Sequence, residues 1–161
     1  MSDEMNDDLT VTMPSDLEVK MVRTFEAPRA LVFEAHSKSQ HLKHWWGRGN
    51  PLDCDIDFRP GGTYRFVEHA PEDGQEYAFR GEFQQIQAPE LIEYTFEYEG
   101  EPGHVCVDTL RFTEEGGRTT ITGVTRFDTK EERDAMVDAG MQDGARQSYE
   151  ALAAYLAKPL A

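Results

Sequence analysis

Hydrophobic and polar residues alternate with a period of two through the middle of the chain. Leu52, Cys54, Ile56 and Phe58 alternate with three aspartates, which gives an extended strand one dry face and one solvated face. Similar runs follow, separated by turn-favouring segments rich in glycine, proline and acidic residues. The pattern predicts strands at residues 17–25, 52–58, 63–69, 76–87, 91–99, 104–113 and 118–127. The short connections between the last six predict an antiparallel meander.

Two regions change to the helical period. After Pro28, which suits the first turn of a helix, apolar residues predict a short helix to about residue 36 and a second piece at 39–46. Thr129 and Glu132 match a capping box and predict a short helix to about residue 138. A longer helix follows the break at Gly140, and we expect its apolar stripe to pack against the sheet. The stripe consists of Met141, Ala145, Tyr149, Leu152 and Leu156.

These elements predict an α+β fold in which a curved antiparallel sheet of seven strands covers its dry face with the long C-terminal helix. Residues 1–16 contain five acidic and no basic residues, and we expect them to form a disordered acidic tail. One domain is expected at 17–158. Its inward strand positions are rich in Phe and Tyr, and an apolar space with a few phenol groups is typical of a small-molecule pocket.

Charge narrows the choice of partners. The 161 residues have a net charge of −15, from 16 Lys and Arg against 31 Asp and Glu. Because no cluster of basic residues is present, nucleic acid and membrane surfaces are disfavoured as partners. The N-terminus lacks the pattern of a secretory signal, and Cys54 and Cys106 form no C-x-x-C pair, so we expect a cytoplasmic protein with reduced thiols. The acidic residues are expected in the tail and on the solvated strand faces, which leaves the cavity face almost free of acid.

Several motifs carry a resemblance to a known family. They include RTFEAP at 23–28, VFEA at 32–35, WWG at 45–47 and DFRPGG at 57–62. The chain resembles the bacterial domains related to the activator of heat-shock-protein ATPase, the Aha-type family. The resemblance implies the helix-grip fold of the START-like SRPBCC superfamily, shared with birch-pollen-allergen-like proteins, in which seven strands grip a long helix around a cavity. Many relatives have a tryptophan directly after the glycine of the last helix, whereas this chain has Gly144-Ala145, so we expect a wider cavity there.

The predicted ligand site combines aromatic residues of the strands with the two tryptophans and the inner face of the last helix. Since Trp45 and Trp46 cannot both face one direction, one is expected in the core and the other at the cavity mouth. We assign no catalytic residue, metal ligand or cofactor. The predicted ligand-binding residues are Trp45, Trp46, Tyr64, Phe66, Tyr77, Phe79, Phe83, Tyr94, Phe96, Phe112, Met141, Ala145 and Tyr149.

Polar residues with other possible roles are interpreted as structural. His36, His41 and His44 lie close together, but no nearby carboxylate or thiol completes a metal site, so we expect surface or helix-end histidines. Cys54 and Cys106 are expected to be small buried hydrophobes.

Charged residues of the strands are expected to be solvated or paired. Asp57 and Arg59 are expected to form an ion pair or fix a turn. Strand arginines are expected to pair with glutamates of the outer face such as Glu68, Glu82 and Glu93, unless one points into the cavity as an anchor for an anion. These arginines are Arg65, Arg80, Arg111 and Arg126.

One strand has an ambiguous face assignment. In 104–113, Val105 and Val107 have the opposite parity to Leu110 and Phe112. A bulge near residue 108 or 109 would place both pairs on the dry face.

Three functions remain open. The first is noncovalent binding of a small lipophilic or aromatic molecule, by a monomer or homodimer. The second is an enzyme similar to the polyketide cyclases or hydrolases of the superfamily, with Tyr94 or Arg65 as the acting group. The third, which rests on the family resemblance alone, is a co-chaperone that stimulates a chaperone ATPase, and the lack of a companion domain weighs against it.

Overall fold

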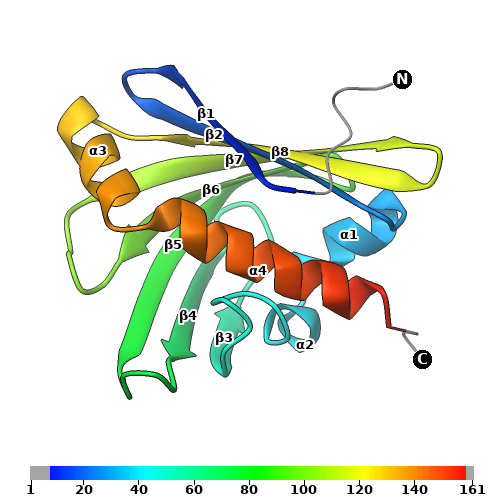
Figure 1. The fold of residues 1–161 in the computed structure, drawn as a ribbon, viewed down its shortest axis with the longest axis horizontal. Helices are drawn as coiled ribbons and strands as arrows, with labels where there is room; N and C mark the ends of the chain where they lie inside the picture. The colour runs from blue at the N-terminus through cyan, green and yellow to red at the C-terminus, as the bar shows by residue number, and fades with distance from the viewer. Residues whose placement is uncertain (1–7, 159–161) are drawn as a thin grey trace.

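The computed structural model describes residues 8–158 and shows one strongly curved sheet that holds a long helix against its concave face (Figure 1). The eight strands are antiparallel in the order β1-β2-β8-β7-β6-β5-β4-β3. They span β1 (Thr10–Ser15), β2 (Glu18–Phe25), β3 (Leu52–Ile56), β4 (Thr63–His69), β5 (Glu76–Gln87), β6 (Leu91–Tyr98), β7 (Val105–Glu115) and β8 (Arg118–Arg126). The predicted α+β helix-grip fold is therefore confirmed.

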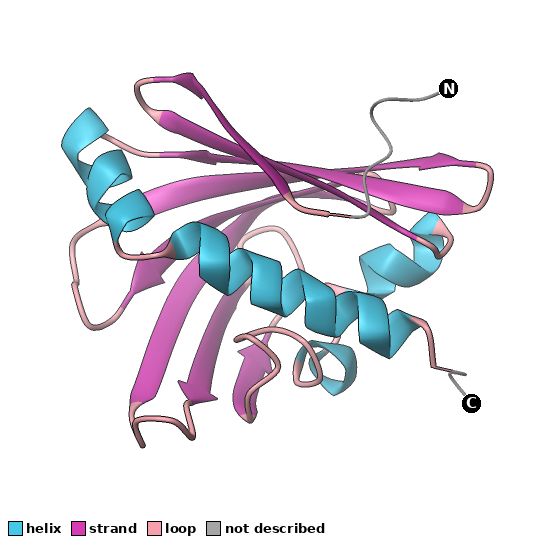
Figure 2. Cartoon of the chain, viewed as in Figure 1, coloured by secondary structure: helices cyan, strands magenta, loops and turns pink. Residues whose placement is uncertain are grey.

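Four helices complete the fold (Figure 2). They are α1 (Arg29–Ala35), α2 (Ser39–Leu42), α3 (Lys130–Asp138) and α4 (Met141–Leu156). Helix α4 crosses the concave side of the sheet, with α3 at its N-terminal end and α1 and α2 near its C-terminal end. The backbone N–H of Glu132 donates to the Thr129 hydroxyl at 3.1 Å, which confirms the hydroxyl half of the predicted capping box, and the Glu132 carboxylate lies 3.2 Å from the His104 Nδ1. Among residues 8–158, no helix has the length and apolarity needed to cross a bilayer.

The eighth strand, β1, lies in the segment for which the sequence predicts a disordered tail. That prediction is wrong for residues 10–15, which pair with β2 in the register Thr10↔Val22 and Thr12↔Lys20. Strand β1 is mostly exposed, so its order comes from backbone pairing at the sheet edge, which the hydrophobic pattern does not report. Residues 1–7 of the predicted tail lie outside the described residues.

The predicted bulge in the strand at 104–113 is also wrong. Strand β7 pairs without a register shift to β6 on one side and β8 on the other. Because alternation is unbroken, Cys106, Asp108, Leu110 and Phe112 all face the concave side. The valines at 105 and 107 face outward, and Val105 is 39% exposed. An acidic residue is therefore placed on the face that was expected to be almost free of acid.

The core fills the end of the concave face that lies beneath α1 and the C-terminal half of α4. Leu152 of α4, Phe112 of β7 and Ile121 of β8 are almost fully buried. Trp45, which is 3% exposed, packs here and donates its indole N–H to the Ala35 carbonyl at 3.0 Å. Because this packing anchors one end of α4, the other end can stand away from the sheet and leave space.

Candidate functional site

A cavity of about 680 Å³ lies between the N-terminal half of α4 and the inward side chains of the sheet. The helix contributes small residues here, including Gly140, Gly144 and Ala145. A Cβ atom built on Gly144 would meet no atom within 4 Å, so the space in front of the helix is open. This volume is within the usual range of ligand pockets, roughly 300–1,000 Å³.

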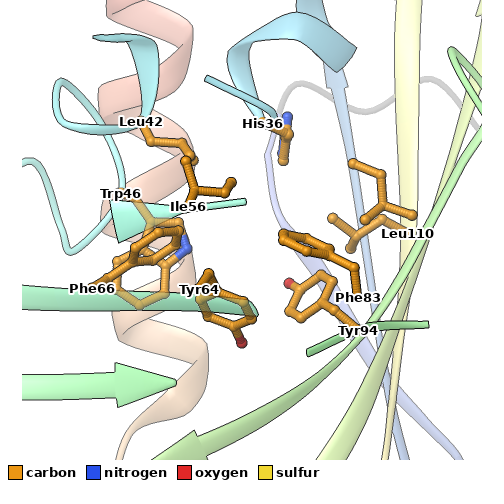
Figure 3. A pocket seen from close by; sticks show the side chains of 10 residues that line it. His36, Leu42, Trp46, Ile56, Tyr64, Phe66, Phe83, Tyr94 and Leu110 are labelled. Atoms are coloured by element: carbon orange, nitrogen blue, oxygen red, sulfur yellow. The ribbon is translucent and has the colours of Figure 1, made fainter. Parts of the chain in front are cut away.

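A smaller cavity of about 40 Å³ adjoins the main one on its inner side (Figure 3). The two share His36, Trp46, Tyr94 and Leu110 as wall residues. The remaining walls of the small cavity are almost entirely apolar and aromatic, as expected for a dry extension of the site.

Twelve of the thirteen residues predicted to bind ligand line one of these two cavities. Tyr64, Phe66 and Phe83 line only the smaller one. The exception is Phe112, which is 1% exposed and packs edge-on against Phe33 at 5.2 Å between ring centroids. Phe112 belongs to the core because α1 covers its position on β7. Contact of the other twelve with a ligand stays a prediction.

The sequence predicted one tryptophan in the core and the other at the cavity mouth, without saying which, and the structure places Trp45 in the core. Trp45 is a core residue whose ring stacks on Tyr149 at 6.1 Å between centroids. Trp46 meets the rings of Phe66 and Phe79 edge-on at 4.9 and 5.2 Å. Trp46 thus forms part of the inner wall between the two cavities and is not confined to the mouth.

A polar row crosses the otherwise apolar sheet in front of the cavity. Tyr94 of β6, Asp108 of β7 and Thr125 of β8 are direct cross-strand neighbours on the inward face, and the Thr125 hydroxyl donates to Oδ1 of Asp108. Burial raises the pKa of Asp108 to about 6, and hydrogen bonds from the Thr125 and Tyr94 hydroxyls act in the opposite direction. Tyr94 is a predicted site residue, whereas Asp108 and Thr125 were not predicted; unbroken alternation through β7 was the signal that could have placed Asp108 on this face.

His36 is a second polar group of the cavity wall, and it lies at the C-terminal end of α1, as expected for a helix-end histidine, but it is buried. It is 9% exposed, and its ring Nδ1 lies 2.8 Å from the Val32 carbonyl, so Nδ1 carries the proton and donates it. Burial lowers the pKa of His36 to about 4, which leaves the ring neutral at pH 7. Within residues 8–158, its Nε2 is buried without a hydrogen-bond partner.

The other two histidines of this region do not join His36. The Nδ1 atom of His41 lies 2.6 Å from the Tyr155 hydroxyl, and His44 stacks on the same tyrosine ring at 4.9 Å. In the described part of the chain, no three His, Cys, Asp or Glu side chains gather as a metal site would require.

Glu68 is the second acid on the cavity face, although the sequence predicted it on the outer face. It is 4% exposed, and its Oε2 accepts from the Arg48 Nε and the Asn50 Nδ2, both at 2.8 Å. Arg48 has a left-handed backbone (φ 61°) between two glycines, and its N–H donates to the Ser148 hydroxyl of α4 at 2.8 Å. This loop therefore ties the cavity rim to the helix.

The strand arginines point away from the cavity. Arg65 pairs with Glu99 at 2.8 Å and Arg80 with Glu97 at 3.1 Å, both on the outer face. Arg126 lies 3.8 Å from Glu18, and Arg111 is exposed. Arg65 therefore cannot act inside the cavity, which removes it from the predicted enzyme site.

Two other structural predictions concern a turn and the thiols. Arg59 and Asp57 form the predicted ion pair at 2.8 Å. Cys54 and Cys106 are both free, and Cys106 is buried beside the cavity. Burial raises the pKa of Cys54 to about 12 and also raises that of Cys106, so both thiols stay protonated at neutral pH.

This architecture is shared with known proteins. The family described as "Activator of Hsp90 ATPase homolog 1-like protein" matches residues 26–157. No curated protein matches the sequence. A solved structure from Rhodobacter sphaeroides is similar with a TM-score of 0.84 and 23% identity, over 93% of this chain and 98% of that one. One from Arthrobacter aurescens has the same TM-score and 25% identity, over 94% and 92%.

A more distant similarity links the fold to a named activity in another protein. An HSP90 activator from Plasmodium falciparum matches with a TM-score of 0.58 and 16% identity, over 78% of this chain and 89% of that one. At this identity the likeness concerns the fold alone.

Proposed function

We propose that this chain, which belongs to the family of activator of Hsp90 ATPase homolog 1-like proteins, binds a small lipophilic or aromatic molecule in the cavity under α4 without covalent chemistry. The observation that carries the proposal is the cavity of about 680 Å³ with walls of Trp, Tyr and Phe and a few inward polar groups. Ligand pockets combine these two features, because apolar walls supply affinity and a few polar groups orient the ligand. The expected cytoplasmic location stays a prediction.

The small residues of α4 support a role for the space itself. Gly144 and Ala145 leave space in front of the helix that larger side chains would occupy. Because water can enter this space, an apolar guest that displaces it from the aromatic walls would gain hydrophobic free energy.

Native mass spectrometry of protein purified without denaturation tests the proposal first, since a retained molecule adds its mass to the chain. Calorimetric titration with 1-naphthylmethanol, a neutral aromatic probe, tests it next. We expect one probe per chain, and at least ~10-fold weaker binding in Ala145→Trp, which fills the cavity from the helix side. Ala154→Trp is the matched control, because Ala154 is an exposed residue of the same helix outside the cavity.

Ala154→Trp distinguishes a filled cavity from a general disturbance of α4. Equal loss of binding in Ala145→Trp and Ala154→Trp would point to a general disturbance of α4. Unchanged binding in both variants would place the probe outside the cavity and contradict the proposal.

The family match supports a second candidate, stimulation of a chaperone ATPase. Adding the full chain to a purified Hsp90-type chaperone and measuring ATP hydrolysis tests it. A rate increase that survives Ala145→Trp would assign the activity to the outer surface, separate from the cavity.

A further inference from the structure

Asp108 stands on the cavity wall, and no basic side chain of the described residues forms an ion pair with it. Its known donors are the hydroxyls of Thr125 and Tyr94, which are neutral, and within residues 8–158 no basic side chain contributes to its pKa. A carboxylate withdrawn from bulk water is unfavourable unless a charged partner offsets the loss of hydration. The protein therefore presents an anionic group whose natural complement is not supplied by its own side chains.

The charges around the cavity are mostly negative. Three carboxylates line it, those of Glu68, Asp108 and Asp143, against one guanidinium, that of Arg48. Arg48 is already held by Glu68, and Asp143 is an exposed rim residue 3.2 Å from Arg146. With a net charge of −15 on the whole chain, the field at the cavity favours cations.

Arg23 of β2 is a buried cation of the sheet, and within residues 8–158 its Nε has no hydrogen-bond partner. Its guanidinium carbon stands 5.0 Å from the centroid of the Phe25 ring, and its charge lowers the pKa of Tyr149. Arg23 does not line the cavity. Within residues 8–158, Arg23 does not contribute to the pKa of Asp108, so it does not serve as the counter-ion of this carboxylate.

Tyrosine side chains share the cavity region with Asp108, and Tyr94 is its direct cross-strand neighbour. Burial raises the pKa of Tyr64, Tyr94 and Tyr149, and the charge of Asp108 raises each further, which places all three phenols within its electrostatic reach. Aromatic rings attract organic cations through their negative faces, and more strongly where water is excluded. A carboxylate and several rings together form the chemistry that selects a protonated amine.

We propose that the cavity recognises lipophilic or aromatic amines, with the ligand ammonium bound to the Asp108 carboxylate and its apolar body among the aromatic walls. This inference rests on the proposed function of the cavity, and it adds the chemical class of the ligand. Thr125 and Tyr94 are positioning residues, because their hydroxyls hold the carboxylate in place.

Three probes with one ring system test the proposal: 1-naphthylmethylamine, which is cationic, 1-naphthylmethanol, which is neutral, and 1-naphthoate, which is anionic. We expect calorimetry on the full chain to give at least ~10-fold tighter binding of the amine than of the alcohol, as for a charged hydrogen bond, and the weakest binding for the carboxylate. Asp108→Asn should abolish the preference for the amine. Glu150→Gln removes a charge from an exposed position of α4 outside the cavity and should retain the preference.

A pH titration of the unaltered protein gives an independent measurement that needs no variant to fold. The preference for the amine should fall as Asp108 is protonated, with a midpoint near pH 6. The surrounding phenols and the Cys106 thiol stay neutral because their pKa values are raised, Arg48 stays charged, and His36 titrates near pH 4.

The outcomes separate the two proposals. Equal binding of all three probes, or a preference that survives Asp108→Asn or stays constant from pH 8 to pH 5, would overturn the assignment to amines and leave the cavity a binding site. Failure of all three probes to bind would overturn the proposed function and this inference with it.

Discussion

Replacing Asp108 by asparagine should stabilise the folded protein at neutral pH, although this residue is part of the proposed binding site. Burial raises the pKa of Asp108 from 3.8 to about 6, so the folded state prefers the protonated acid. The stability that this preference contributes is fully present below pH 4 and is lost as the pH rises through 6. Asparagine resembles the protonated acid in shape and carries no charge at any pH.

The size of the effect follows from the shift. A difference of about 2 units between the folded and unfolded pKa corresponds to ~3 kcal/mol. Because the side chain is only partly buried and faces a cavity that water can enter, we expect about 1 to 3 kcal/mol of added stability at pH 8. Near pH 4 the unfolding free energies of the two proteins should differ by less than about 0.5 kcal/mol, since Asp108 is then protonated and uncharged, like asparagine.

Urea denaturation followed by circular dichroism, repeated between pH 4 and pH 8, measures this difference. Asp143→Asn serves as the control, because the Asp143 side chain is 80% exposed and its replacement should have a small effect on the unfolding free energy. A constant loss of stability at every pH in Asp108→Asn would refute the reasoning. It would mean that the carboxylate acts chiefly as the acceptor for Thr125 and Tyr94.

Three further predictions concern other elements. His36→Phe should reduce the loss of unfolding free energy between pH 7 and pH 4 by up to ~3 kcal/mol. The pKa of His36 is lowered from 6.5 to about 4, so the stability from its neutral ring is present above pH 6.5 and lost as the pH falls through 4. Thermal midpoints at pH 7 and pH 4 measure this effect, and equal pH dependence in both proteins would contradict it. Gly144→Ala should raise the unfolding free energy by about 0.5–1 kcal/mol, because alanine favours the helix and its Cβ meets open space. Gly81→Ala should lower it by about 1–3 kcal/mol or more, because a Cβ there would overlap the Thr95 carbonyl oxygen. Similar urea midpoints for the two variants would contradict this difference in local space. Thr129→Ala should lower the unfolding free energy by about 1 kcal/mol because it removes the hydroxyl that caps α3. Urea denaturation measures this loss, and an unchanged midpoint would mean that water replaces the hydroxyl.

The fold was predictable because its main signals are local. Alternation in the strands, the glycine-rich turns and the helical stripe after Gly140 each depend on neighbouring residues, and the structure reproduces them with small shifts at the element ends. Strand β1 was not predictable in this way. It is held by pairing with the edge of β2, and its mostly exposed side chains carry no hydrophobic pattern.

The candidate site was predictable only for its apolar part. The parity of each strand assigned most aromatic wall residues, whereas Phe112 was misplaced because its burial depends on the cover supplied by α1. Asp108, Glu68 and His36 were missed because a polar residue on a strand or helix is normally solvated. Their burial depends on contacts from distant segments, such as Thr125 for Asp108 and Arg48 for Glu68.

The sequence by itself determined the α+β class, the order of the elements after residue 17, the family resemblance and an aromatic dry face, because periodicity and turn chemistry act over a few residues. The tertiary structure alone decided that the small residues of α4 face open space and that an unpaired carboxylate stands in this space. The reason is physical: the cavity depends on how far the helix stands from the sheet, and the cost of a charge depends on what surrounds it in three dimensions. The acidity that the sequence assigned to the tail and the solvated faces thus also extends into the proposed ligand site.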